Sequence, residues 1–159
     1  MRIIRSVNQA TTKVCELAMV IFAIIMVLAC FAQICTRLAE IPLSWSEELA
    51  RYMAVWLTFI GAAYALRKRS LATVEILYNK LQGTNRKILY ILISIFIFVF
   101  CAVLIKYGFA FALKFMKQKS PALQIPKGAI YLCAPISGIL IFLYQIELLI
   151  DNVGKEEQV

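Results

Sequence analysis

The chain has 159 residues, of which 62% are hydrophobic and 16% are charged, and its mean hydropathy is +0.81. Since a soluble domain usually carries about a quarter of charged residues, this composition excludes an ordinary soluble domain and indicates a membrane protein. The net charge of +8 would suggest nucleic-acid binding in a soluble protein. In a membrane protein, basic residues at helix ends orient the helices instead, so we expect no nucleic-acid partner.

Four apolar segments are long enough, or nearly so, to cross a membrane, which takes about 20 residues. With their short connections they take up nearly the whole chain, so the sequence predicts an all-α integral membrane protein with one domain over residues 1–159. The transmembrane helices are expected at residues 14–36, 47–66, 88–110 and 129–150. The first apolar segment is too long for the core of a signal peptide and is followed by no A-x-A-like cleavage site, so we interpret it as a retained span.

Two acidic residues lie near span ends, Glu16 in the first span and Glu147 in the fourth. An acid within a membrane span indicates function by default. A side chain near a span end can also reach the interface between membrane and water. We favour this second interpretation for both residues, and a functional role stays open.

The segment WSEELARY, Trp45–Tyr52, opens the second span with two glutamates and an arginine. Ser44 and Glu47 have the spacing of a capping box, with Ser44 as the N-cap. Glu47 and Glu48 would lie in the first turn, where the helix dipole favours negative charge, and Arg51 could pair with either. The segment is therefore either a well-capped helix start or a contact surface for a partner.

The rest of the second span shows two different faces. Small residues recur at helical spacing on one face, which is typical of close helix packing. They are Ala50, Ala54, Thr58, Gly61 and Ala65. The other face is bulkier and carries Trp45, Leu49, Tyr52, Trp56, Phe59 and Ala63. Such a helix could serve two neighbours, one inside the bundle and one outside.

The loop between spans 2 and 3 carries a helical pattern of apolar residues. Leu71, Val74, Leu77 and Leu81 share one helix face, so we expect an amphipathic helix lying in the membrane interface. Residues 83–85, with the sequence GTN, predict its end and a turn.

The third span continues past Lys106 as KYGFAFALKFMKQK without a helix breaker. We expect an outward helical extension that ends at Ser120-Pro121, because proline disfavours helix at the preceding residue. In the fourth span, Pro135 predicts a kink, which membrane helices tolerate.

Basic residues indicate that both termini lie in the cytoplasm. With four spans, the termini share a side with the loop between spans 2 and 3. These segments hold ten of the 17 Lys and Arg residues, and the cluster at Arg67–Ser70 is the strongest signal.

Cysteine and histidine usage favours neither catalysis nor metal binding. The sequence contains no histidine, and none of its five cysteines forms a C-x-x-C pair. Buried free cysteines behave as small apolar residues. We therefore expect no disulfide, no metal site, no cofactor and no enzymatic activity, since a membrane enzyme needs clustered acid, base or metal residues.

Two sequence blocks carry a family pattern. In the block at residues 45–70 the matching positions are Trp45, Glu47, Glu48, Arg51, Trp56 and Gly61. The block at residues 120–138, SPALQIPKGAIYLCAPISG, matches P-A-L-x-I-P followed by Tyr and Pro. Together, in this order, they resemble the small membrane subunit of tripartite ATP-independent periplasmic (TRAP) transporters, the DctQ type. The chain departs from the family at Leu71, near which members often carry a histidine.

The resemblance implies a small, non-transporting subunit that scaffolds and anchors a large elevator-type membrane subunit. It implies a bacterial inner-membrane transporter driven by a sodium gradient, with an organic acid of the C4-dicarboxylate or sialic acid type as its substrate. The implied partners are the large TRAP membrane subunit, a periplasmic substrate-binding protein and membrane lipid.

Two groups of residues are candidate contact sites. The matching residues of the first block, Trp45, Glu47, Glu48, Arg51, Trp56 and Gly61, are candidates for the subunit interface. Four lysines in excess on the outer side could attract the binding protein electrostatically. These docking candidates are Lys114, Lys117, Lys119 and Lys127.

An alternative function is a small homodimeric four-helix exporter of drugs or protons. Such proteins use a carboxylate in the first span, a part that Glu16 could play. The chain is long for that class, and Glu16 lies near the span end.

Overall fold

The computed structural model describes residues 2–41, 43–68 and 84–156. It contains the helices α1 (Arg2–Leu38), α2 (Ser44–Arg67), α4 (Thr84–Phe115), α5 (Lys127–Tyr131) and α6 (Cys133–Glu156). Within these residues, four helical segments are long and apolar enough to cross a membrane: Asn8–Leu38, Ser44–Arg67, Ile88–Phe115 and Lys127–Ile150. The predicted all-α integral membrane fold is confirmed. The predicted interfacial helix at residues 71–81 lies outside the described residues.

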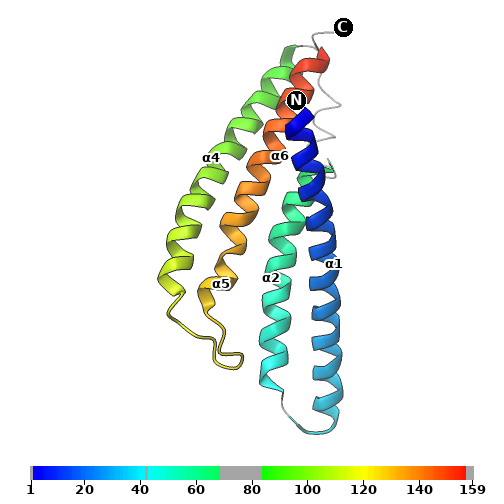
Figure 1. The fold of residues 1–159 in the computed structure, drawn as a ribbon, viewed down its shortest axis with the longest axis vertical. Coiled ribbons are helices and arrows are strands. Elements are labelled where there is room, and N and C mark those ends of the chain that lie inside the picture. The colour runs from blue at the N-terminus through cyan, green and yellow to red at the C-terminus, as the bar shows by residue number, and fades with distance from the viewer. Residues whose placement is uncertain (1, 42, 69–83, 157–159) are drawn as a thin grey trace.

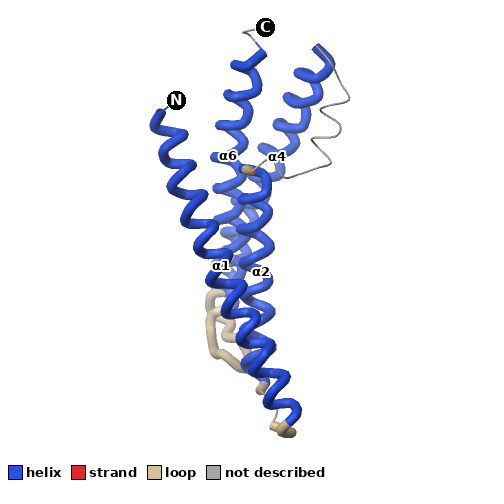
Figure 2. Tube along the Cα trace, turned by 90° about the vertical axis from the view of Figure 1, so that its right-hand side faces the viewer, coloured by secondary structure: helices blue, strands red, loops and turns tan. Residues whose placement is uncertain are grey.

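The helices lie side by side in the order α1, α2, α6 and α4 (Figure 1). Helices α2 and α6 are therefore central, while α1 and α4 are peripheral. The start of α1 and the end of α6 lie at one end of the molecule, called here the terminal end. The α1–α2 and α4–α5 connections lie at the opposite end, called here the loop end. A side view shows that α1, α6 and α4 diverge toward the terminal end (Figure 2).

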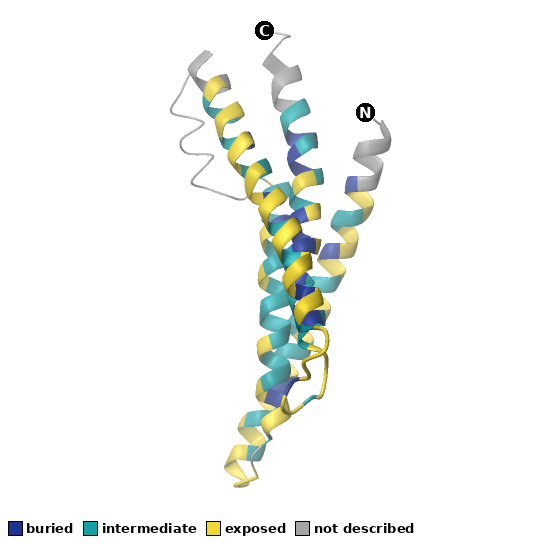
Figure 3. Cartoon of the chain, turned by 90° about the vertical axis from the view of Figure 1, so that its left-hand side faces the viewer, coloured by how far each residue is buried: buried dark blue, intermediate teal, exposed yellow. Residues whose placement is uncertain are grey.

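The peripheral helices carry many exposed large apolar residues. Figure 3 shows exposed positions in yellow along them. On α1 these include Ile24 and Phe31, and on α4 they include Phe96 and Phe100, which are 70% and 58% exposed. An apolar surface of this extent is rare on a soluble monomer and suits contact with lipid or with another membrane chain.

The fourth span is interrupted at Leu132, between α5 and α6. Pro135 lies three residues further on, and its missing N–H cannot donate to the carbonyl of Tyr131. The ring of Pro135 is buried against α4, where a Cβ added to Gly108 would lie 2.9 Å from Pro135 Cδ. The interruption agrees with the kink that the sequence predicts.

Helix α4 differs from the prediction at both ends. It already includes Thr84 and Asn85, which were expected in a turn, because weak turn preferences are overridden where a long apolar helix continues. It ends at Phe115 rather than at Ser120. The chain folds back there because the rings of Phe111 and Phe115 pack on Tyr131 of α5, with centroids 5.0 and 5.5 Å away.

Candidate functional site

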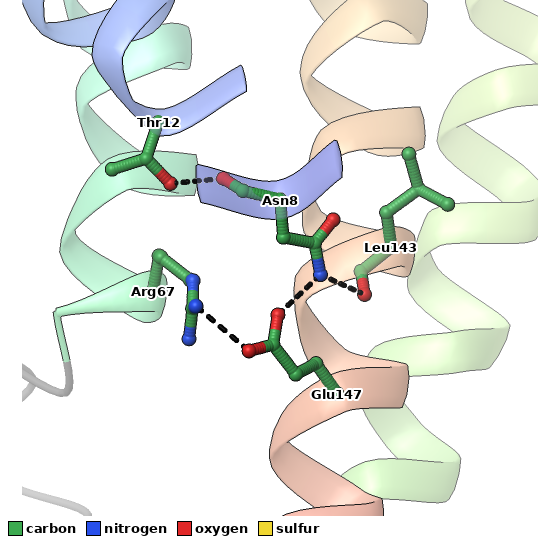
Figure 4. Close-up of polar contacts among 5 residues, drawn as sticks. All are labelled: Asn8, Thr12, Arg67, Leu143 and Glu147. Atoms are coloured by element: carbon green, nitrogen blue, oxygen red, sulfur yellow. Dashed lines mark hydrogen bonds and ion pairs between the residues drawn. The ribbon is translucent and has the colours of Figure 1, made fainter. Parts of the chain in front are cut away.

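Three helices meet at a largely buried ion pair (Figure 4). Arg67 on α2 donates from Nη2 to Glu147 Oε1 on α6 over 2.8 Å. Asn8 on α1 donates from Nδ2 to the other Glu147 oxygen and, at 3.3 Å, to the carbonyl of Leu143. We call Asn8, Arg67 and Glu147 the terminal cluster. It connects α1, α2 and α6 through one carboxylate.

The terminal cluster is almost closed to its surroundings. The side chains of Arg67 and Glu147 are 19% and 6% exposed, and Asn8 is 1% exposed. A buried ion pair is tolerated only where further hydrogen bonds satisfy the remaining groups, and Asn8 supplies one of these. The backbone carbonyl of Asn8 accepts a hydrogen bond from Thr12 Oγ1 over 2.6 Å. The cluster therefore fixes how three helices meet.

The expectation that Glu147 reaches the membrane interface is wrong, because the side chain turns inward to Arg67. Sequence reasoning also missed Asn8 and treated Arg67 only as an orientation signal. A signal was available, since one polar residue near the same end of three different spans predicts a shared site. Glu16 is exposed on α1, as its predicted position near the interface allows.

A second polar contact connects α6 to α4. Gln145 donates from Nε2 to Ser94 Oγ over 2.8 Å, and both side chains are buried. The Ser94 hydroxyl donates in turn to the carbonyl of Tyr90. Helix α6 therefore has polar contacts with every other long helix, through Glu147 on one side and Gln145 on the other.

At the loop end, Glu48 on α2 binds the connection between α4 and α5. Its Oε2 accepts hydrogen bonds from the backbone amides of Ala122 and Leu123, each over 2.9 Å. Its Oε1 accepts one from the hydroxyl of Tyr52. The buried Ser120 hydroxyl lies against both side chains. We call Glu48, Tyr52, Ser120, Ala122 and Leu123 the loop cluster. It joins segments 74 residues apart.

The predicted capping box at the start of α2 is wrong. The N-cap is Leu43, whose apolar side chain cannot accept a hydrogen bond, and Ser44 is the first helical residue. Glu47 pairs with Arg51 over 3.1 Å at the surface, where the two side chains are 63% and 69% exposed. Glu48 is engaged by the loop instead of by Arg51. The geometry fails because the helix begins at Ser44, one residue earlier than a capping box with Ser44 as its N-cap requires.

The other interface candidates divide between the inside and outside of the chain. Trp45 is 44% exposed. Trp56 packs on Phe22 of α1 with ring centroids 5.9 Å apart. Gly61 also faces α1, since a Cβ added there would lie 3.8 Å from Met19 Sδ. The predicted small-residue face is divided in the same way, because Thr58 is exposed while Gly61 faces a neighbouring helix.

The four docking candidates gather at the loop end. Lys114 lies in the last turn of α4, Lys117 and Lys119 lie in the connection, and Lys127 begins α5. The first three are exposed and Lys127 is half-buried. Among the described residues, His, Cys, Asp and Glu form no group of three or more that could hold a metal ion.

A family comparison and a curated relative both match the chain to the same class of transporter component. The family described as tripartite ATP-independent periplasmic transporters, DctQ component, matches residues 26–154. The chain is 25% identical over 150 residues to a Haemophilus influenzae protein whose name describes a TRAP transporter small permease protein, with 94% of this chain and 93% of that protein covered.

Two further relatives are matched over shorter regions. The C4-dicarboxylate TRAP transporter small permease protein DctQ of Rhodobacter capsulatus is 29% identical over 107 residues, covering 66% of this chain and 47% of that protein. The isethionate TRAP transporter permease protein DctMQ of Oleidesulfovibrio alaskensis is 29% identical over 118 residues, covering 70% of this chain and 17% of that much longer protein.

Proposed function

The chain belongs to the DctQ component family of TRAP transporters, and from this premise we propose that it scaffolds and anchors the large membrane subunit of a sodium-driven transporter for an organic acid. As a multi-pass small permease subunit it belongs to a class that works with a large membrane subunit and is not enzymatic. The DctMQ relative supports this pairing, since the matched region is a small part of one longer permease chain.

One observation carries the scaffold role: buried polar side chains in the described helices join those helices to one another. Glu147 is engaged by Arg67 and Asn8, and Gln145 is engaged by Ser94. These groups stabilise a fixed arrangement of helices. The surfaces of α1 and α4 are apolar and face outward, as a static subunit beside a membrane partner requires.

We narrow the proposed interface with the large subunit to the candidate residues that are exposed. Glu48, Trp56 and Gly61 make contacts inside the chain. Trp45, Glu47 and Arg51 are exposed, so we assign the contact with the large subunit to these residues. The exporter alternative has no comparable support in the family match, which names a transporter subunit.

We assign the loop end to the periplasm and both termini to the cytoplasm of a bacterial inner membrane, following the distribution of basic residues. Lys114, Lys117, Lys119 and Lys127 then face the compartment of the substrate-binding protein. Their positive charge would speed encounter with an acidic surface on that protein. The names of the relatives support organic acids as the substrate class, with C4-dicarboxylate and isethionate as examples.

The first test is purification of the tagged chain in mild detergent from its native membrane, followed by mass spectrometry. We expect a much larger multi-pass membrane protein at a fixed ratio. A matched purification of an unrelated tagged membrane protein controls for carry-over. Recovery of this chain alone, as a homodimer, would overturn the scaffold role and make Glu16 the residue to test.

A second test addresses the lysines. Reversing the charge of all four should reduce uptake and weaken its dependence on salt, while leaving recovery of the large subunit unchanged. Unchanged uptake with unchanged salt dependence would remove the binding protein as their partner.

A further inference from the structure

The connection between α4 and α5 is closed on itself by backbone hydrogen bonds. We call residues 118–127, which run from this connection to the first residue of α5, the closed loop. The Ser120 amide donates to the carbonyl of Ile125 over 2.9 Å, and the Lys127 amide donates to the carbonyl of Gln118 over 2.8 Å. The Ile125 amide donates to Ser120 Oγ, and Gln124 takes a positive φ of 56° to complete the turn. These bonds give the loop one defined shape.

The position of the closed loop relative to α2 depends on Glu48. Its carboxylate takes two consecutive amides at the tip, Ala122 and Leu123, while Tyr52 holds the other oxygen. A charged acceptor strengthens each of these hydrogen bonds, and two donors on one oxygen fix direction as well as distance. Without this carboxylate the amides would turn to water, and the loop could shift as a unit.

The closed loop carries part of the positive surface at the loop end. Lys119 is paired in the backbone with Pro126, next to Lys127, so the loop sets the spacing of these two lysines. Lys117 directly precedes the loop. Ile125, which is 38% exposed, adds an apolar side chain to the surface of the loop. Exposed lysines together with an exposed apolar side chain fit contact with a soluble protein that presents an acidic surface.

We propose that Glu48 is a positioning residue for partner recognition: it holds the closed loop so that Lys119 and Lys127 meet an acidic soluble protein in a fixed geometry. This inference rests on the proposed function, under which that protein is the substrate-delivering binding protein. It also changes the part assigned to Glu48, from a contact with the large subunit to a contact within the chain.

The sign of the effect separates positioning from simple charge. Replacing Glu48 with alanine removes one negative charge from a positive surface. If charge alone mattered, an acidic partner would then bind more tightly. If Glu48 positions the loop, the same partner binds more weakly. Glu40 gives a matched control, because it is an exposed acid in the α1–α2 connection at the same end of the chain.

The experiment uses the complete two-subunit complex in proteoliposomes, with uptake measured against the concentration of binding protein. Glu48→Ala should raise the half-saturating concentration about tenfold, at the low end of what electrostatic steering supplies, with little change in maximal rate. Glu40→Ala should leave it unchanged or lower it. Glu48→Gln should keep the half-saturating concentration close to that of the wild type, because its amide oxygen can still accept hydrogen bonds from the loop amides. Hydrogen exchange at the amides of Ala122 and Leu123 should accelerate in Glu48→Ala but not in Glu40→Ala.

The outcomes are distinct. If no large subunit is recovered with the purified wild-type chain, the proposed function fails. If charge reversal of the four lysines reduces uptake but Glu48→Ala behaves like Glu40→Ala, the positioning role is overturned and the function stands. Should Glu48→Ala fail to assemble, Ser120→Ala replaces it, because it removes a loop contact without altering α2. An unchanged half-saturating concentration in Ser120→Ala, despite faster exchange in the loop, also overturns the proposal.

Discussion

The two ends of the molecule each use a glutamate to join distant segments, but they do so with different partners. At the terminal end, Glu147 binds the side chains of Arg67 and Asn8 and is 5% exposed. At the loop end, Glu48 binds two backbone amides of a connection and is half-buried. A buried carboxylate leaves a charge without a partner when it is removed, whereas water can replace a half-exposed one. The terminal cluster should therefore control stability, and the loop cluster should control the position of a surface.

The largest effect is expected at Glu147, whose removal tests whether the terminal cluster controls stability. Glu147→Ala leaves the Arg67 guanidinium buried without its counter-charge, which should lower the free energy of unfolding by about 3–5 kcal/mol. Denaturation of the purified chain in detergent measures this change. The control is Glu16→Ala, an exposed acid on α1 whose loss should cost less than about 0.5 kcal/mol.

A double variant makes the same test sharper. Glu147→Leu combined with Arg67→Leu removes both charges and should be more stable than Glu147→Ala alone, because no charge stays buried without a partner. Equal losses in the single and double variants would show that the ion pair does not determine how α2 and α6 meet.

A glycine pair tests whether the loop end also depends on tight packing. A Cβ added at Gly128 would lie 2.3 Å from the carbonyl oxygen of Ala112, so Gly128→Ala must push α5 away from α4. We expect a loss of about 1–3 kcal/mol in the free energy of unfolding. Gly61→Ala is the matched control: its Cβ has ordinary space at 3.8 Å, and alanine should be neutral or stabilising by up to about 1 kcal/mol. Similar effects at both positions would argue against close packing of α5.

The all-α fold class follows from composition, and the four membrane-spanning segments follow from the length of the apolar runs. This is why the sequence predicts the fold. The break before Pro135 also follows from local chemistry. The contacts of Glu147 and Glu48 do not. Both partners of Glu147 lie on other helices, and the amides of Ala122 and Leu123 belong to a connection 74 residues beyond Glu48.

The capping-box prediction at the start of α2 was wrong because it used sequence spacing alone. Ser44 and Glu47 have capping-box spacing, yet the helix begins at Ser44. Ser46 instead donates its hydroxyl to the carbonyl of Leu43 over 2.8 Å. Sequence spacing gives the residues that could interact along one helix, while long-range packing decides which of them do.

The contact between α6 and α4 should contribute less than the terminal cluster, because it involves no charge. Ser94→Ala removes the acceptor of Gln145 and should lower the free energy of unfolding by about 0.6 kcal/mol, and at most by about 1.7 kcal/mol, the range known for polar contacts between membrane helices. Ser137→Ala is the control, since its hydroxyl donates to the carbonyl of Ala134 within α6. A loss as large as that in Glu147→Ala would remove the distinction between charged and neutral contacts.

The smallest effect is expected at Arg51, whose ion pair with Glu47 is the exposed counterpart of the pair between Arg67 and Glu147. Because both side chains are more than half exposed, Arg51→Ala should lower the free energy of unfolding by only about 0.2–0.5 kcal/mol, and less at high salt. Arg67→Ala, the same change at the buried pair, should cost several times more. Recovery of the large subunit provides the second measurement. If recovery falls in Arg51→Ala while stability hardly changes, the exposed pair acts between subunits, as we propose. If recovery is unchanged, the pair belongs only to the surface of α2, and the contact with the large subunit must lie along the apolar faces of α1 or α4.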